Sequence, residues 1–305
     1  LLTVFQSLTL TPSFLVSVPS TGMLYASIPN STIINPNTVI PISAATGTVG
    51  TPIPVGRNPV ILAASTDGKY LYVALAGDQA IQRINLQTQA IERTFPFPAN
   101  ICTTCGPAAP VDLQVVPGNS QEVVLSQGNM LTLFNDSGMV NYVPGSTSLY
   151  YMAPFNSLAF AGNPQSIYSL PFTIVQNSFF GTVTMDADGL HYTPVTGTNY
   201  GGNNTTGSHV VSDGTLLYTN SGEVWNPATA IQTGTFPVTV FYTGNRNLAL
   251  DTTLDKIYLI GYQSLGNSYT NVLTAYSKSS LAVTGTLAFP QINGIDLTDL
   301  VRWGS

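Results

Sequence analysis

The chain has 305 residues, of which 44% are hydrophobic and 7% are charged, and its formal net charge is -6. An acidic chain with so few cations cannot neutralise a phosphate backbone, which argues against nucleic-acid binding. No apolar run approaches the ~18 residues that a membrane-spanning helix needs, so no membrane span is predicted.

The first predicted element is a strand at residues 1–10, where apolar and polar residues alternate. A pattern that recurs along the chain follows it: a tight turn, and then an alternating strand that carries a Tyr at a fixed place. The copies cover residues 20–27, 67–74, 212–219 and 254–260, with a degenerate copy at 118–126 that lacks the Tyr, and the Tyr residues are Tyr25, Tyr72, Tyr218 and Tyr258. Tyr72 lies 47 residues after Tyr25, and a period of about 40 to 50 residues with strand signals is typical of a four-stranded propeller blade.

Another strand precedes each turn, and a Leu or an equivalent residue marks its start. The residues just before this position are Phe14, Ile61, Asp112, Ser157, Ser208, Asn247 and Asp299. Seven starts predict an all-β fold, a seven-bladed β-propeller that occupies residues 1–305 as a single domain. Six blades is the alternative, because the fourth and fifth starts are poorly defined.

The second half of each blade is also visible in the sequence. Residues 37–56, 79–97, 222–238 and 272–289 alternate apolar and polar positions with period two. This alternation predicts pairs of strands packed between neighbouring blades.

The two cysteines, Cys102 and Cys105, lie in the stretch ICTTCG. A thioredoxin-type redox pair needs a helix start after its first Cys, whereas Gly106 and Pro107 follow here. A zinc site needs four ligands, and His191 and His209 are the only histidines in the chain. We therefore predict a disulfide that pins a loop in an oxidising compartment, with free thiols as the alternative.

Two loops carry further candidate sites. Asp186 and Asp188 precede Gly189 like the opening of a calcium loop, but no late acidic ligand follows, and a plain hairpin turn is the other interpretation. Residues 197–208 are rich in Gly, Asn and Thr, which predicts a surface loop. Triplets for N-glycosylation begin at Asn30, Asn135, Asn203 and Asn204.

The end of the chain bears on how the ring of blades closes. Residues 299–305 begin an inner strand, and the sequence stops where a second strand is expected. Because an open sheet edge exposes unpaired backbone groups, we predict that residues 1–10 pair with this C-terminal strand in a composite terminal blade. Pairing of the same terminal strand with a neighbouring copy, and hence self-assembly, is the alternative.

The stretch STDGKYLYVALAGDQAIQRINLQTQAIERTFPF, residues 65–97, resembles the YVTN-type β-propeller repeat of surface-layer proteins. That repeat reads Pro-x-x-Leu-Ala-x-Ser-x-Asp-Gly-x-x-Leu-Tyr-Val-Ala and then Val-x-x-Ile-Asp-x-x-Thr-Gly, and the matching residues are Pro59, Leu62, Ala63, Ser65, Asp67, Gly68, Leu71, Tyr72, Val73, Ala74, Ile84 and Thr88. Asn85 stands where the repeat has Asp, and Gln89 stands where it has Gly. The ending DLVRWGS resembles the final repeat of secreted bacterial propellers of this type. The resemblance implies a propeller fold and an extracellular setting, but no reaction, because the family includes surface proteins, binding modules and lactonase-like enzymes.

A candidate binding site follows from the topology. In a propeller the first strand of each blade lines a central channel, so the starts of these strands meet at one mouth. Arg57, Asp112, His209, Arg246 and Asp299 lie at or near five such starts. Convergent polar groups in a concave site are typical of binding, whereas strand ends are also polar simply because they meet solvent.

The sequence contains no catalytic motif. It has no Gly-x-Ser-x-Gly elbow, no His-Glu-x-x-His, no P-loop and no dinucleotide fingerprint. We therefore predict a non-enzymatic module of the extracellular space or cell surface, without cofactor or metal, that binds a protein partner or a glycan or builds a surface, matrix or filament. The alternative is a lactonase-like hydrolase whose site lies at the channel mouth.

Overall fold

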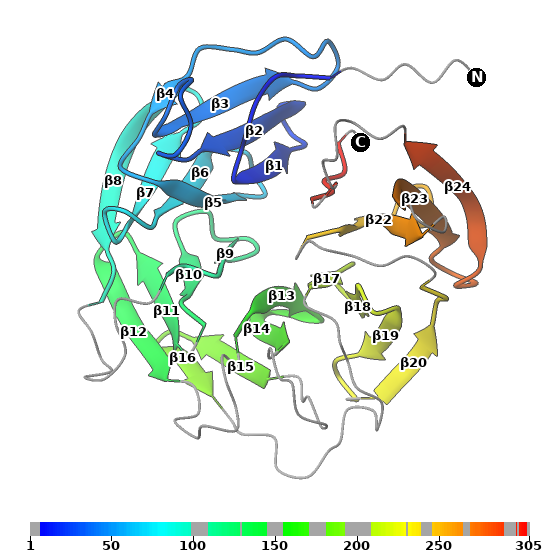
Figure 1. Cartoon of the computed structure of the whole chain (residues 1–305). Coiled ribbons are helices and arrows are strands. Elements are labelled where there is room, and N and C mark those ends of the chain that lie inside the picture. The colour runs from blue at the N-terminus through cyan, green and yellow to red at the C-terminus, as the bar shows by residue number, and fades with distance from the viewer. Residues whose placement is uncertain are drawn as a thin grey trace. The chain divides into compact units, whose positions relative to one another are not determined.

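Six four-stranded sheets make up the part of the chain that the computed structural model describes (Figure 1). The described residues are 7–98, 109–128, 130–144, 155–170, 181–192, 209–229, 231–238, 246–264, 269–289, 297 and 299–303. They form 24 strands and no helix, so none of them supplies a helix that could cross a bilayer. In each sheet consecutive strands are neighbours, which is the meander of a propeller blade.

The strand bounds follow the repeats read from the sequence. The first three sheets contain β1 (Phe14–Val18), β2 (Met23–Ile28), β3 (Thr38–Ser43) and β4 (Ile53–Pro54); β5 (Pro59–Ala64), β6 (Tyr70–Leu75), β7 (Ala80–Asn85) and β8 (Ala90–Pro96); and β9 (Asp112–Val115), β10 (Val123–Ser126), β11 (Met130–Asn135) and β12 (Gly138–Pro144). The last three contain β13 (Ser157–Ala161), β14 (Asn163–Leu170), β15 (Gly181–Asp186) and β16 (Gly189–Tyr192); β17 (Val210–Ser212), β18 (Leu217–Thr219), β19 (Glu223–Asn226) and β20 (Ile231–Thr235); and β21 (Leu248–Asp251), β22 (Lys256–Ser264), β23 (Tyr269–Ser277) and β24 (Val283–Phe289).

The prediction of seven blades is wrong, and the six-bladed alternative is confirmed. The first six predicted starts lie within two residues, along the sequence, of the first residues of β1, β5, β9, β13, β17 and β21. The seventh start, Asp299, forms an isolated parallel bridge with Arg246 instead of opening a further antiparallel sheet. A strand-like sequence at the end of the chain was therefore mistaken for a blade, because sequence periodicity does not show whether partner strands follow.

The described residues also do not form the predicted composite terminal blade. The first sheet is completed by four consecutive strands, β1 to β4, and takes none from the C-terminal end. Residues 7–10 are not in a strand, and the side chains of Leu8 and Leu10 pack against the buried Ala26, Ile28, Ile40 and Ile42. Residues 1–6 lie outside the described part of the chain.

The chain divides into two compact units. The first unit comprises Leu1–Leu125, Phe134–Met139 and Trp303–Ser305, and the second comprises Ser126–Leu133 and Val140–Arg302. The first two sheets lie in the first unit, the last three lie in the second, and strands of the third have residues in both. The sequence-based expectation of a single domain stays a prediction.

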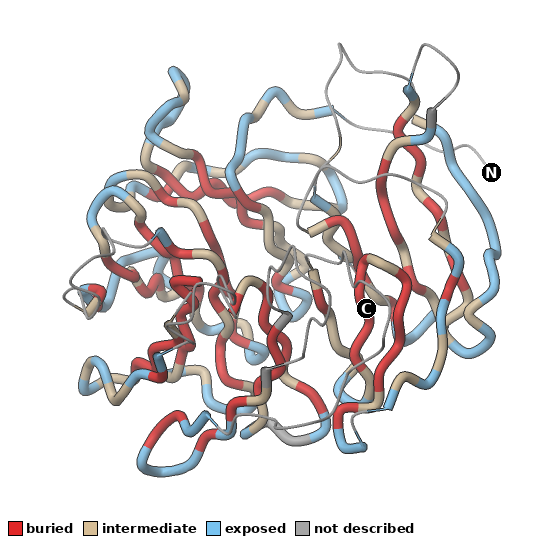
Figure 2. Tube along the Cα trace, turned by 60° about the horizontal axis from the view of Figure 1, so that its bottom comes forward, coloured by how far each residue is buried: buried red, intermediate tan, exposed pale blue. Residues whose placement is uncertain are grey.

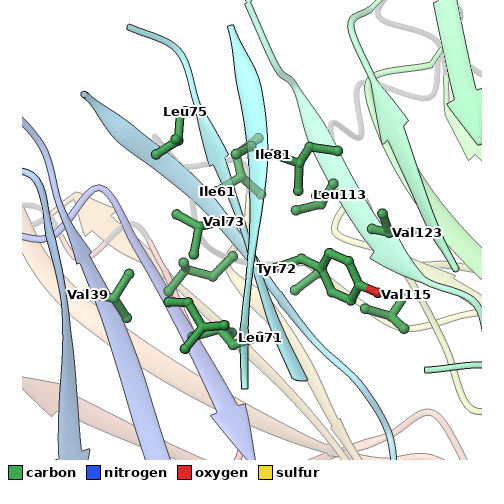
Figure 3. Close-up of a cluster of buried hydrophobic side chains, with 14 of the residues drawn as sticks. Val39, Ile61, Leu71, Tyr72, Val73, Leu75, Ile81, Leu113, Val115 and Val123 are labelled. Atoms are coloured by element: carbon green, nitrogen blue, oxygen red, sulfur yellow. The ribbon is translucent and has the colours of Figure 1, made fainter. Parts of the chain in front are cut away.

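The core of the first unit consists of apolar side chains from successive sheets (Figure 3). Five of the six residues of β6 are buried, so both faces of this strand are covered by protein. That is why YLYVAL is nearly continuous in apolar character although it is a strand. The neighbouring sheets supply the partners for its two faces, and the labelled residues in Figure 3 are Val39, Ile61, Leu71, Tyr72, Val73, Leu75, Ile81, Leu113, Val115 and Val123.

In the second unit, too, apolar side chains from successive sheets form the core. One cluster joins the fourth and fifth sheets through Ala159, Ala161, Tyr168, Val210, Leu217 and Trp225. Another joins the fifth and sixth sheets, where the rings of Phe236 and Tyr276 are 4.9 Å apart between centroids. Figure 2 shows the result along the chain: buried residues run along many of the strands, and exposed residues occupy the connecting turns and much of the outer strands, such as β8 and β24.

A bulge recurs in the outer strand of three sheets. The register shifts by one residue at Glu92 in β8, at Thr233 in β20 and at Thr284 in β24. A bulge leaves one residue unpaired and twists the strand locally, which discourages pairing of an open edge with another strand. Its recurrence at matching places indicates that the sheets are copies of one repeat.

A side chain of the third sheet clamps the turn of the fourth. Asn141 in β12 donates from Nδ2 to the carbonyl oxygen of Leu190 at 3.0 Å, and its Oδ1 accepts the Leu190 backbone N–H at 2.8 Å. Leu190 follows Gly189, whose φ is +115°, and the Asn141 amide occupies the space that a Cβ on Gly189 would need. Gly189 is thus required both by its backbone conformation and by the clamp.

Gly138 offers a matched control for this clamp, because it has a φ of +111° at the first residue of β12 but has open space around its Cβ position. We expect Gly189→Ala to lower the free energy of unfolding by about 1 to 3 kcal/mol more than Gly138→Ala does. Urea denaturation of the two variants measures the difference. In an Asn141→Ser background the difference should shrink, and equal losses in the two glycine variants would show that the clamp contributes nothing.

Candidate functional site

The starts of the inner strands occupy equivalent positions in the six sheets, and their chemistry changes along the chain. In the first two sheets this position is a buried apolar residue, Phe14 or Ile61. In later sheets it becomes polar, as Asp112, Ser157, His209 and Asn247. Asp112, Ser157 and Asn247 are all buried, so their polar atoms need partners within the protein.

Two buried amides connect the inner strands of the fifth and sixth sheets. The backbone N–H of His209 donates to Asn220 Oδ1 at 3.2 Å, and Asn220 Nδ2 donates to Asn247 Oδ1 at 3.0 Å. Asn247 Nδ2 then donates to the carbonyl oxygen of Ile260 at 3.1 Å. This chain of amides fixes the starts of β17 and β21 against each other.

Three of the five residues predicted to lie at the channel mouth, His209, Arg246 and Asp299, are found beside these amides in the second unit. Arg246 immediately precedes Asn247 and forms the parallel bridge with Asp299, where the Leu300 N–H donates to the Arg246 carbonyl oxygen at 2.9 Å. The charge of Arg246 acts on both His209 and Asp299. We call His209, Arg246 and Asp299 the inner polar cluster.

The electrostatics of the inner polar cluster keep His209 neutral. Burial of the imidazole, together with the nearby Arg246 charge, lowers the pKa of His209 from 6.5 to about 3. Its Nδ1 is buried and has no hydrogen-bond partner among the described residues. An imidazole held neutral in this way cannot act as an efficient general base near pH 7, because a good base has a pKa close to the working pH.

The pKa of Asp299 shifts in the opposite direction to that of His209. The protein around its carboxyl raises the pKa of Asp299 above the usual value, and the Arg246 charge opposes this change. The Asp299 side chain is nevertheless exposed, so solvent screens the interaction and little stability depends on it.

The other two predicted residues lie in the first unit and have partners of their own. Arg57 donates from Nε to Asp78 Oδ1 at 2.6 Å and from its backbone N–H to Asp78 Oδ2 at 2.6 Å. The carboxylate of Asp112 accepts the Leu113 N–H at 2.7 Å and Gln114 Nε2 at 3.3 Å. Both residues thus hold local backbone in place.

Sequence reasoning missed three ion pairs that connect distant repeats. In the first unit the buried Arg83 pairs with Asp136 at 2.5 Å and lies 4.3 Å from the centroid of the Tyr70 ring. In the second unit Lys278 Nζ lies 2.7 Å from Asp213 Oδ2, and Arg302 Nε lies 2.9 Å from Asp251 Oδ2. The partners are more than 50 residues apart in sequence, so no local signal joins them.

A buried acid was also missed. Glu223 is buried in β19, its pKa is raised by that burial, and its Oε2 accepts Trp225 Nε1–H at 3.3 Å. The spacing of two residues that places Glu223 and Trp225 on one face of the strand is visible in the sequence EVWN, but the burial of that face is not.

The remaining candidate sites have different outcomes. Asp186 accepts the Asp188 N–H and lies 2.8 Å from His191 Nε2, which fits the hairpin turn of β15 and β16. The described residues contain no group of three or more His, Cys, Asp or Glu that could hold a metal ion. Asn30 is exposed, whereas Asn135 is half-buried and its Oδ1 accepts the Ser137 N–H. Cys102, Cys105, Asn203 and Asn204 lie outside the described residues, so the disulfide and these glycosylation sites stay predictions.

No family model and no curated protein matches this chain. Among solved structures, the β-propeller domain of Cps50 (Swd1) from Myceliophteria thermophila is similar, with a TM-score of 0.66 and 10% identity over 95% of this chain and 90% of that chain. Hydrazine synthase from Kuenenia stuttgartiensis also aligns, with a TM-score of 0.46 and 11% identity over 95% of this chain and 69% of that chain. The first likeness confirms the β-propeller fold, and neither extends to function.

The neutral state of His209 predicts a specific pH dependence of stability. Because the folded pKa, about 3, lies below the unfolded value of 6.5, the unfolded state binds the proton first as the pH falls. The native state should therefore lose roughly 3 kcal/mol through this residue between pH 6.5 and about pH 4. Urea unfolding at several pH values measures this loss.

His209→Gln removes the titrating group, so its stability should fall less steeply over the same pH range than that of the wild-type protein. His191→Gln is the matched control, because His191 is the other histidine and is exposed. Parallel curves for the wild-type protein and His209→Gln would contradict a buried, neutral His209.

Proposed function

We propose that this chain is a non-catalytic module that works outside the cell, where it binds a protein partner or a glycan or builds a surface, matrix or filament. The proposal includes the assignment of its repeats to the YVTN type. The fold is compatible with it, because propellers present broad faces and edges for contact and need no catalytic group to do so.

The observation that carries the proposal is the state of the inner polar cluster. A hydrolase at this place needs a base with a pKa near the working pH, and the pKa of His209 is lowered to about 3. Arg57 is paired with Asp78, and the Asp112 carboxylate is buried and accepts hydrogen bonds from its own strand. The predicted mouth residues thus serve to hold the inner strands, which leaves contact through the outer surface as the supported role.

Several exposed aromatic side chains have chemistry that suits binding. Tyr142, Tyr192, Tyr269 and Trp303 are all exposed to solvent to a substantial extent. Tyrosine and tryptophan combine a flat apolar ring with a polar group, which suits contact with a protein or a sugar. Asn30 lies in an exposed loop, which makes its N-S-T triplet accessible to a glycosylating enzyme in an extracellular setting.

Hydrolysis assays on a panel of lactones and esters test the proposal. We expect no turnover above the uncatalysed rate from the wild-type protein. Turnover that His209→Ala or Asp112→Asn abolishes would establish the lactonase-like alternative. Because Asp112 is buried, circular dichroism must show that the Asp112→Asn variant keeps its fold, and a folded variant should retain partner binding.

A further inference from the structure

The dipeptide Asp-Gly occurs three times in the chain, and each copy lies at a turn between two strands. Asp67–Gly68 joins β5 to β6, Asp188–Gly189 lies at the turn of β15 and β16, and Asp213–Gly214 joins β17 to β18. In this dipeptide the Gly nitrogen can attack the Asp side-chain carboxyl and close a succinimide ring, because glycine has no side chain to hinder the attack. Whether a given copy reacts therefore depends on how firmly the folded protein holds the carboxyl and the nitrogen.

Both reacting groups are held at the first of these turns. Asp67 Oδ1 accepts the Ser65 hydroxyl at 2.7 Å and the Lys69 N–H at 3.1 Å. The Gly68 N–H donates to the carbonyl oxygen of Ser65 at 3.0 Å. The turn must lose these hydrogen bonds before the Gly68 nitrogen can reach the Asp67 carboxyl.

The third turn is held more firmly still. Asp213 Oδ1 accepts the Leu216 N–H at 2.8 Å, and Asp213 Oδ2 accepts Lys278 Nζ at 2.7 Å. The Gly214 N–H donates to Ser212 Oγ at 2.9 Å. The Asp213 side chain is also only 6% exposed, so water has little access to it.

The second turn leaves its carboxyl free to move. Asp188 is exposed, and its carboxylate has no hydrogen bond or ion pair with any residue that the structure describes. The Gly189 N–H faces the Asp186 carboxylate, whose pKa is lowered by hydrogen bonds from the His191 side chain and the Asp188 backbone. Asp186 is therefore ionised near neutral pH and is placed to take a proton from the Gly189 nitrogen.

We propose that Asp188 is a modification site, at which a succinimide forms with Gly189 and then opens to isoaspartate. In the first step the Gly189 nitrogen bonds to Cγ of the protonated Asp188 carboxyl. The nitrogen loses its proton and the carboxyl loses its hydroxyl, so one water leaves. In the second step one water returns and breaks one of the two bonds between the ring nitrogen and a ring carbonyl carbon, which gives either aspartate or isoaspartate. The reaction needs only water, so it is independent of the proposed function.

The clamp between the third and fourth sheets controls how fast this reaction proceeds. Gly189 is buried, and Asn141 holds Leu190 through two hydrogen bonds, so ring closure requires the hairpin of β15 and β16 to open locally. β16 is the last strand of its sheet, so this opening breaks only its pairing with β15 and the clamp. A local opening of this kind costs less free energy than global unfolding.

The product also damages the clamp. Isoaspartate adds one carbon to the main chain between Asp188 and Gly189. The Asn141 amide occupies the space beside Gly189, so the longer chain cannot keep Gly189 and Leu190 in their places. Molecules that carry isoaspartate should therefore lose the link between β12 and β16 and unfold at a lower urea concentration.

Peptide mapping by mass spectrometry tests the proposal after prolonged incubation of the native protein in heavy-oxygen water. Each passage through the succinimide introduces one solvent oxygen, and fragmentation of the peptides locates the isoaspartate. We expect label and isoaspartate at Asp188 to accumulate about tenfold faster or more than at Asp67 and Asp213, because those turns must first lose more hydrogen bonds. In concentrated urea the three sites should react at similar rates, because all three are Asp-Gly and the fold is gone.

Two variants separate the chemistry from the fold. Asn141→Ser should speed the reaction at Asp188 and leave the rates at Asp67 and Asp213 unchanged, since it releases only the clamp. Asp188→Glu is the matched control, because a Glu side chain would need a larger and slower-forming ring, and its urea midpoint should not fall on incubation as that of the wild-type protein does.

A native protein whose Asp188 stays unlabelled while it reacts in urea overturns the proposal. Equal rates at the three native turns, or an equal fall of the urea midpoint in the wild-type protein and Asp188→Glu, overturns it as well. Turnover in the lactone and ester panel would remove the proposed function and leave the modification site standing.

Discussion

In each four-stranded sheet, burial of both faces of the second strand is the constraint on which the rest of this structure depends. β6 has five buried residues out of six, so its sheet must have another sheet against each face. A four-stranded antiparallel meander alone cannot meet this requirement, but a series of such meanders can, because each covers the face of the next. The repeated apolar strand therefore dictates the propeller, and the outer strands, which bury less, are left to vary.

Three ion pairs join parts of the chain that are far apart in the sequence. Arg83 with Asp136, Lys278 with Asp213 and Arg302 with Asp251 employ three of the 8 cationic residues, and each pair has at least one side chain with little exposure. A pair of this kind is costly to break, since the remaining partner stays buried without compensation. Charge serves to fix neighbouring elements against each other, which leaves an outer surface of Thr, Asn, Tyr and aliphatic side chains for contact.

The sequence predicted the strands well because their signals are local. The Tyr register of Tyr25, Tyr72, Tyr218 and Tyr258 falls in β2, β6, β18 and β22, and the alternating segments fall in the third and fourth strands of their sheets. The number of blades was wrong because Asp299 has the local signature of an inner strand but pairs with Arg246. Arg83 and Asp136 were missed because 53 residues separate them. His209, Arg246 and Asp299 were predicted from topology, but the low pKa of His209 depends on burial that a sequence does not show.

Hydrogen–deuterium exchange resolved by strand tests the central claim most directly. If burial of the second strands holds the fold together, the amides of β6, β10, β18 and β22 should exchange slowest, at a rate set by global unfolding. The amides of β8 and β24 should exchange faster, since most residues of these outer strands are exposed. Exchange in the second strands as fast as in β8 and β24 would contradict the account.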